Sequence, residues 1–158
     1  MSNPIPPGAP KLILNHFLPY QLVALADQVS RIISQIYGAG FSLGRPEWRV
    51  LASLVELGPV SATDICAHST QDKMTVSRAV ASLESRGLLQ RRSAPEDRRN
   101  KLLELTETGV RLYEEMVPLI LAQQARLLAG LSDHERETLD TLLSRLKKQA
   151  DDLTSKAA

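Results

Sequence analysis

The sequence predicts a mainly α-helical protein of the α+β class, and three observations support this prediction. Apolar residues recur at intervals of three and four over residues 11–37 and again over 107–153, which is the spacing of amphipathic helices. Only two short segments, residues 88–92 and 101–105, have the character of β-strands. Two short helices joined by a turn precede these strands, so we expect a helix-turn-helix followed by a β-hairpin, with long helices at both ends.

The first ten residues are rich in proline and are expected to form a flexible arm. A long helix is predicted from about residue 11 to 37, with an apolar stripe that only Pro19 interrupts. Gly38, Gly40 and Gly44 then mark a loop.

The central region begins with a helix that Pro46 opens and Gly58-Pro59 ends. Ser61 and Asp64 have the spacing of a capping box, which predicts the start of a short helix over residues 62–68. A turn at residues 69–70 leads to the next helix.

The segment from residue 71 to 101 has the pattern of a DNA-reading element. Val76, Val80 and Leu83 form one buried stripe, and short polar or cationic side chains occupy the other face, as suits a major groove. Met74 is expected to pack against other side chains of the protein and not to recognise DNA bases. The outward residues are Gln71, Lys73, Thr75, Ser77 and Arg78.

Gly87 is predicted to end this helix in the left-handed conformation, and a hairpin follows whose tip carries Arg98 and Arg99. Residues 71–101 hold eight Lys or Arg and four Asp or Glu, a local net charge of +4 in a chain whose total is +1. Basic charge concentrated on one element indicates a polyanion bound locally. Helix, turn, helix and basic hairpin together predict a winged helix-turn-helix.

Two further helices are expected over residues 107–129 and 133–153, with a kink at Pro118 and a capping box formed by Ser132 and Glu135. The first helix and these last two carry more apolar surface than a small winged-helix core can cover, which predicts a homodimer. We therefore expect one unit over residues 11–158, with dimerisation helices at 11–44 and 107–158 and the winged helix-turn-helix at 45–106.

Several classes of protein are disfavoured. The chain has no long apolar stretch and no signal-peptide pattern, so we expect a cytoplasmic protein without membrane contact. Cys66 is the single cysteine, and the histidines lack metal-ligand spacing, so no metal or cofactor is predicted. Asp64, Cys66 and His68 are two residues apart on one helix and do not face each other, so an enzyme is not expected.

Five segments, in order and at these spacings, resemble the MarR-type transcriptional regulators of bacteria. They are Pro46-Glu47-Trp48-Arg49-Val50-Leu51, Asp72-Lys73-Met74-Thr75-Val76-Ser77-Arg78, Leu83-Glu84-Ser85-Arg86-Gly87-Leu88, Asp97-Arg98-Arg99 and Leu105-Thr106-Glu107-Thr108-Gly109.

The resemblance implies an obligate dimer on double-stranded DNA, with two recognition helices in successive major grooves of a pseudopalindromic operator. It implies that Arg98 or Arg99 enters the flanking minor groove and that Asp97 helps to hold the wing. The predicted DNA-binding residues are Ser61, Gln71, Lys73, Thr75, Ser77, Arg78, Arg91, Arg98 and Arg99.

The resemblance also implies an effector cavity where the dimerisation helices meet the DNA-binding lobe. Aromatic walls and a cation suit an aromatic carboxylate or its thioester, so a ligand-responsive repressor is the main prediction. An effector-free architectural protein or activator, and a redox-responsive regulator that uses Cys66, are the alternatives. The predicted cavity residues are His16, Phe17, Tyr20, Tyr37, Trp48 and Arg49.

Overall fold

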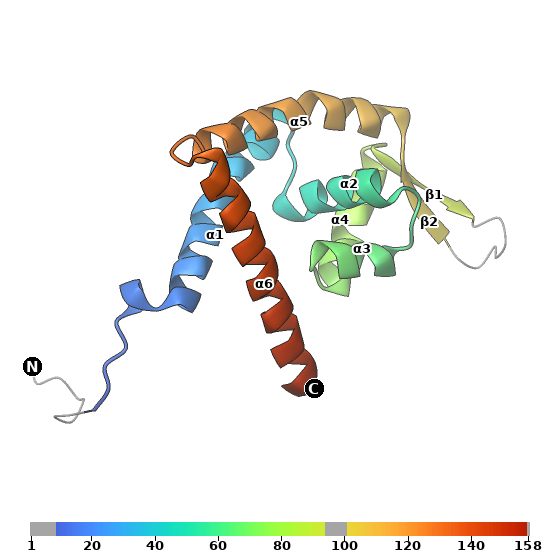
Figure 1. The fold of residues 1–158 in the computed structure, drawn as a ribbon. Helices are drawn as coiled ribbons and strands as arrows, with labels where there is room; N and C mark the ends of the chain where they lie inside the picture. Colours follow the sequence, from blue (N-terminus) through green and yellow to red (C-terminus); the bar gives the residue numbers. More distant parts are fainter. Residues whose placement is uncertain (1–8, 94–100, 158) are drawn as a thin grey trace, which may run out of the picture. The chain divides into compact units, whose positions relative to one another are not determined.

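A computed structural model describes residues 9–93 and 101–157, and the chain divides into two compact units, residues 1–116 and 117–158. Helices dominate both units, and one two-stranded sheet lies in the first (Figure 1). The predicted fold class, a winged helix-turn-helix with helical ends, is confirmed.

The first helix is shorter than the sequence predicts. A 3-10 turn at Leu14–His16 precedes α1, which runs from Leu18 to Gln35 with Pro19 in its first turn. Proline is tolerated there because its missing N–H would have no partner inside the helix, whereas deeper in a helix it removes a hydrogen bond. The prediction that the helix begins near residue 11 is therefore wrong. A π-helical turn at Ile36–Gly40 follows α1.

The winged helix-turn-helix matches its predicted order. It consists of α2 (Arg45–Leu57), α3 (Ala62–Ser69), α4 (Lys73–Ser85) and the antiparallel strands β1 (Leu89–Ser93) and β2 (Lys101–Leu105). Val60 also bridges to Leu103, which attaches the segment before α3 to the hairpin. The buried core of this lobe includes Val50, Leu51, Leu54, Ile65, Val76, Val80, Leu83, Leu89 and Leu103.

Two glycines shape the junctions of this lobe. Gly87 ends α4 with φ of 67°, the left-handed conformation that the sequence predicts. Gly109 lies in the first turn of α5 (Glu107–Leu127), where a Cβ atom would lie 2.0 Å from the carbonyl oxygen of Leu88. The helix can approach the start of the hairpin this closely only because residue 109 has no side chain.

The second unit contains the end of α5 and the long helix α6 (Asp133–Ala157), and the unit boundary falls at Met116, two residues before Pro118. The predicted capping box is confirmed, since Glu135 accepts hydrogen bonds from the backbone and hydroxyl of Ser132. Among the described helices none is long and apolar enough to cross a membrane. Large apolar side chains stay exposed on α6: Leu139, Leu142, Leu143, Leu146 and Leu153.

Candidate nucleic-acid interface

The start of α4 is held by a side-chain cap. Asp72 accepts hydrogen bonds from the backbone N–H of Thr75 at 2.9 Å and from its hydroxyl at 2.6 Å. The bond from the Thr75 hydroxyl, followed by those from the backbone, holds the pKa of Asp72 below its usual 3.8. The first turn of α4 is therefore fixed, and the Thr75 hydroxyl donates its proton within the protein instead of facing outward.

We expect the replacement of Asp72 by asparagine to alter the dependence of folding stability on acid pH. Asparagine is also a good N-cap, but it does not titrate. Because the folded-state pKa is lowered, the ionised Asp72 contributes stability above the unfolded pKa of about 3.8, and this contribution is lost as the pH falls through the lower folded value. Melting temperatures of both proteins, measured from about pH 7 down to about pH 2.5, should converge at the acid end. Parallel pH profiles would contradict the assignment.

The turn before α4 is tied to its neighbours. Arg49 of α2 donates to the backbone carbonyl of Ser69 at 3.2 Å, and the Gln71 amide donates to the Ser69 hydroxyl at 3.1 Å. Arg49 therefore binds the last carbonyl of α3. Ser61 opens α3 as predicted, in a capping box in which it lowers the pKa of Asp64 by hydrogen bonding.

The outward face of α4 presents most of the side chains that the sequence placed there. Lys73, Ser77 and Arg78 are exposed, whereas Thr75 is half-buried. The expectation that Met74 packs is wrong, because 63% of its surface is exposed. The helix therefore offers a mixed surface of cations, a hydroxyl and one apolar side chain.

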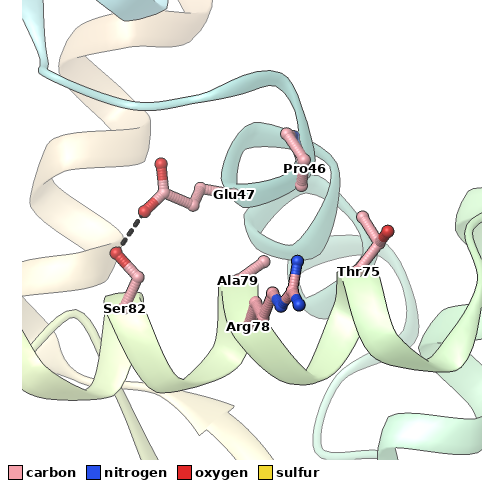
Figure 2. Close-up of a pocket in the computed structure, with 6 residues that line it drawn as sticks. All are labelled: Pro46, Glu47, Thr75, Arg78, Ala79 and Ser82. Atoms are coloured by element: carbon pink, nitrogen blue, oxygen red, sulfur yellow. Dashed lines mark hydrogen bonds between the residues drawn. The ribbon is translucent and has the colours of Figure 1, made fainter.

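A cleft of about 340 Å³ lies between the start of α2 and one flank of α4. Figure 2 shows Pro46 of α2 on one side of it, with Thr75 and Arg78 of α4 on the other. Glu47 caps the backbone of Gly44 and accepts a hydrogen bond from the Ser82 hydroxyl, which joins α2 to α4. The Arg78 guanidinium thus lies on the flank of α4 that borders this cleft.

The wing is joined to α4 by an ion pair. Arg91 of β1 lies 3.0 Å from the carboxylate of Glu84, and Arg92 lies 3.5 Å from Glu104 of β2. The side chain of Arg91, a predicted DNA contact, is therefore paired with a residue of α4. Asp97, Arg98 and Arg99 lie outside the described residues, and their roles stay predictions.

Three aromatic rings form a column beside α2. Trp48 stacks between Tyr37, at 6.3 Å, and Tyr113 of α5, at 5.9 Å, with both pairs inclined by 14°. Burial raises the pKa of Tyr37, and partial burial lowers that of Arg49. Tyr113 was missed by the sequence analysis, which lacked any signal that α5 would meet Trp48.

The predicted cavity residues fall into two groups. Tyr37, Trp48 and Arg49 lie at or beyond the end of α1, whereas His16, Phe17 and Tyr20 lie exposed near its start. At 1.5 Å per residue, about 25 Å of helix separates Tyr20 from Tyr37. One chain therefore does not bring the two groups together.

The residues considered for catalysis have other contacts. Asp64 belongs to the capping box of α3. His68 joins α3 to α2, since its Nδ1 lies 2.9 Å from the Ser53 hydroxyl and its Nε2 lies 3.1 Å from the Glu56 carboxylate. Cys66 is half-buried. Asp64 and His68 thus direct their polar atoms to structural partners.

Comparisons with known proteins find relatives with the same fold. The model of the MarR family matches residues 43–101. The uncharacterized HTH-type transcriptional regulator YwoH of Bacillus subtilis (strain 168) is 33% identical over 109 residues, which cover 69% of this chain and 79% of YwoH. A crystal structure of a MarR/EmrR family transcriptional regulator from Acinetobacter sp. ADP1 is 28% identical with a TM-score of 0.82, over 89% of this chain and 99% of that one.

A third relative is a solved structure of BpsR from Bordetella bronchiseptica, whose DNA binding is regulated by 6-hydroxynicotinic acid. It is 29% identical with a TM-score of 0.73, and the match covers 82% of this chain and 98% of BpsR.

Proposed function

Since this chain belongs to the MarR family of DNA-binding transcriptional regulators, we propose that it is a ligand-responsive repressor, which binds a pseudopalindromic operator as a homodimer. The observation that carries the DNA-binding part of this proposal is the outward face of α4, which a side-chain cap holds in place and on which Lys73, Ser77 and Arg78 are exposed. Side chains of this kind suit the base edges and phosphates of a major groove.

The DNA contacts divide by role. Lys73 and Ser77 lie in the first turns of α4, which a recognition helix directs at base edges. Arg78 lies on the flank that faces α2, so we assign it to a phosphate at the edge of the groove. The Glu84–Arg91 pair would hold the wing beside the same groove, with Arg98 and Arg99 in the minor groove as the resemblance implies.

We expect mutations of the wing arginines and mutations of the outward residues of α4 to weaken DNA binding in different ways. Arg98→Ala and Arg99→Ala should weaken binding to every duplex and should reduce the slope of log K against log salt by about one unit per lost phosphate contact in each subunit. Lys73→Ala and Ser77→Ala should instead cost about 1–3 kcal/mol on the operator wherever a bidentate base contact is lost, and little on scrambled DNA.

A gel-shift titration of an operator and a scrambled duplex at two salt concentrations tests this division of roles between α4 and the wing. The operator can be obtained by selecting bound fragments from a pool of random duplexes. Equal losses on both duplexes for the Lys73 and Ser77 variants would show that α4 does not read the sequence.

The effector site is proposed at the aromatic column of Tyr37, Trp48 and Tyr113. Stacked rings next to Arg45 and Arg49 suit an aromatic acid, because the rings bind its plane and a cation binds its carboxylate. BpsR, which an aromatic acid regulates, is similar to this chain and supports the ligand class. His16, Phe17 and Tyr20 could reach such a column only from a second copy, and we assign them there.

A short series of contacts links the aromatic column to the start of α4. Trp48 is followed by Arg49, which holds the Ser69 carbonyl at the end of α3. Asp72, the cap of α4, lies three residues further along. A ligand that moves Trp48 would disturb the Arg49 contact, and with it the start of α4.

A panel of aromatic acids and their thioesters tests the effector class. We expect at least one compound to raise the melting temperature and to release the protein from its operator, because a ligand stabilises the state that it binds. A panel that changes neither quantity would favour the effector-free alternative. Release by an oxidant that Cys66→Ser abolishes would favour the redox-responsive alternative.

A further inference from the structure

One apolar side chain occupies the centre of the outward face of α4. Each residue turns a helix by about 100°, so the buried residues Val76, Ala79, Val80 and Leu83 define the inward direction. Met74 points almost directly away from this direction, with Ser77 and Arg78 one turn later on either side of it. Lys73 and Thr75 lie closer to the edges of the buried face.

This methionine is separate from the apolar surfaces that suit dimerisation. Those surfaces lie on α1, α5 and α6, whereas Met74 is the only exposed large apolar residue of α4, all of which the structure describes. Its exposed neighbours on the helix are Lys73, Ser77 and Arg78. A single apolar side chain that is surrounded by charged and polar groups is too small to form the apolar centre of a protein–protein interface.

The position of Met74 is also well defined. It lies in the first turn of α4, between the cap residue Asp72 and its partner Thr75. The Thr75 hydroxyl is engaged with Asp72, so the outward groups of this turn are the Lys73 ammonium and the Met74 thioether. The side chain that points most directly outward in this turn, Met74, therefore carries a thioether, which hydrogen-bonds only weakly.

We propose that Met74 recognises the 5-methyl group of a thymine in each half-site of the operator. Residues at the start of a recognition helix contact base edges, and the thymine methyl is the apolar group that standard base pairs present in the major groove. Contact between the methyl and the thioether removes both from water. This inference rests on the proposed function, since it requires that α4 reads DNA.

Deoxyuridine substitution tests this contact, because it removes the methyl and leaves the hydrogen-bonding groups of the base in place. Each thymine of a selected operator would be replaced in turn, and the affinity measured by gel shift. We expect one symmetric pair of thymines to be sensitive, with a loss of about fourfold for one half-site and about fifteenfold for both.

Met74→Ala should bind more weakly than the wild type and should be insensitive to the same thymine-to-uracil change. Met74→Leu keeps an apolar side chain and should keep the sensitivity, and Ser77→Ala should keep it as well. Since Met74 is exposed and alanine and leucine favour helices, the variants should melt as the wild type does.

Two results would overturn the inference: no thymine whose methyl contributes to wild-type affinity, or a methyl effect of the same size in Met74→Ala. Both results leave the proposed function intact, because the protein still selects a sequence. Failure to enrich any sequence would instead contradict the proposed function.

Discussion

Replacing Leu142 and Leu146 by glutamate is expected to abolish both dimerisation and DNA binding. Both leucines are nearly half exposed on one face of α6, and together with Leu139 and Leu143 they form an apolar stripe. Complete burial of a leucine contributes about 1.5–3 kcal/mol, and nearly half of that surface is left for the dimer to bury, so the four leucines of a dimer contribute about 4 kcal/mol. Their loss weakens dimerisation about 10³-fold, before the cost of burying carboxylates is added.

Sedimentation at low micromolar concentration and gel shifts on the operator measure the two effects. The wild type should sediment at about twice the 17.4 kDa of one chain, and the variant at about that mass or as an unfolded chain. The affinity for the operator should fall when the dimer dissociates, because a monomer binds an operator of two half-sites through only one recognition helix.

Thr141→Glu with Ser144→Glu is the matched control, because these two positions lie on the opposite face of α6 and receive the same number of acids. This control protein should remain a dimer that binds DNA. A Leu142 and Leu146 variant that is still a dimer would place the interface elsewhere.

Gly109→Ala is expected to destabilise the protein strongly, although alanine is the better helix former. Helix propensity alone would favour alanine by about 1 kcal/mol. The added Cβ would, however, lie 2.0 Å from the Leu88 carbonyl oxygen, a backbone atom that can move only with the end of α4 and the start of β1. We expect a loss of about 3 kcal/mol or more from the free energy of unfolding, a large part of the stability of a typical domain.

Urea unfolding measures this loss, and Gly130→Ala is its control. A Cβ at position 130 would meet no atom within 4 Å, so the control should unfold as the wild type does. The operator affinity of Gly109→Ala should also fall, because Leu88 lies between the reading helix and the wing. An unchanged unfolding midpoint would mean that α5 lies further from the hairpin than the structure places it.

Local features of the sequence are sufficient to predict much of this fold. The capping boxes at Ser61 and Ser132 and the left-handed Gly87 depend on groups a few residues apart, so their spacing alone identifies the helix ends. The buried stripe of α4 follows from helical periodicity in the same way. These interactions form wherever the segment is helical, whatever packs against it.

The contacts of the candidate sites depend instead on residues far apart in the chain. Tyr113 meets Trp48 only because Gly109 lets α5 approach the hairpin, and Arg91 is engaged only because β1 runs back beside Glu84. Thr75 is half-buried and Ser82 donates to Glu47 because α2 covers one flank of α4, which no spacing within α4 reveals. Periodicity shows that a helix has a buried face, but only the packing of its neighbours determines how far that face extends.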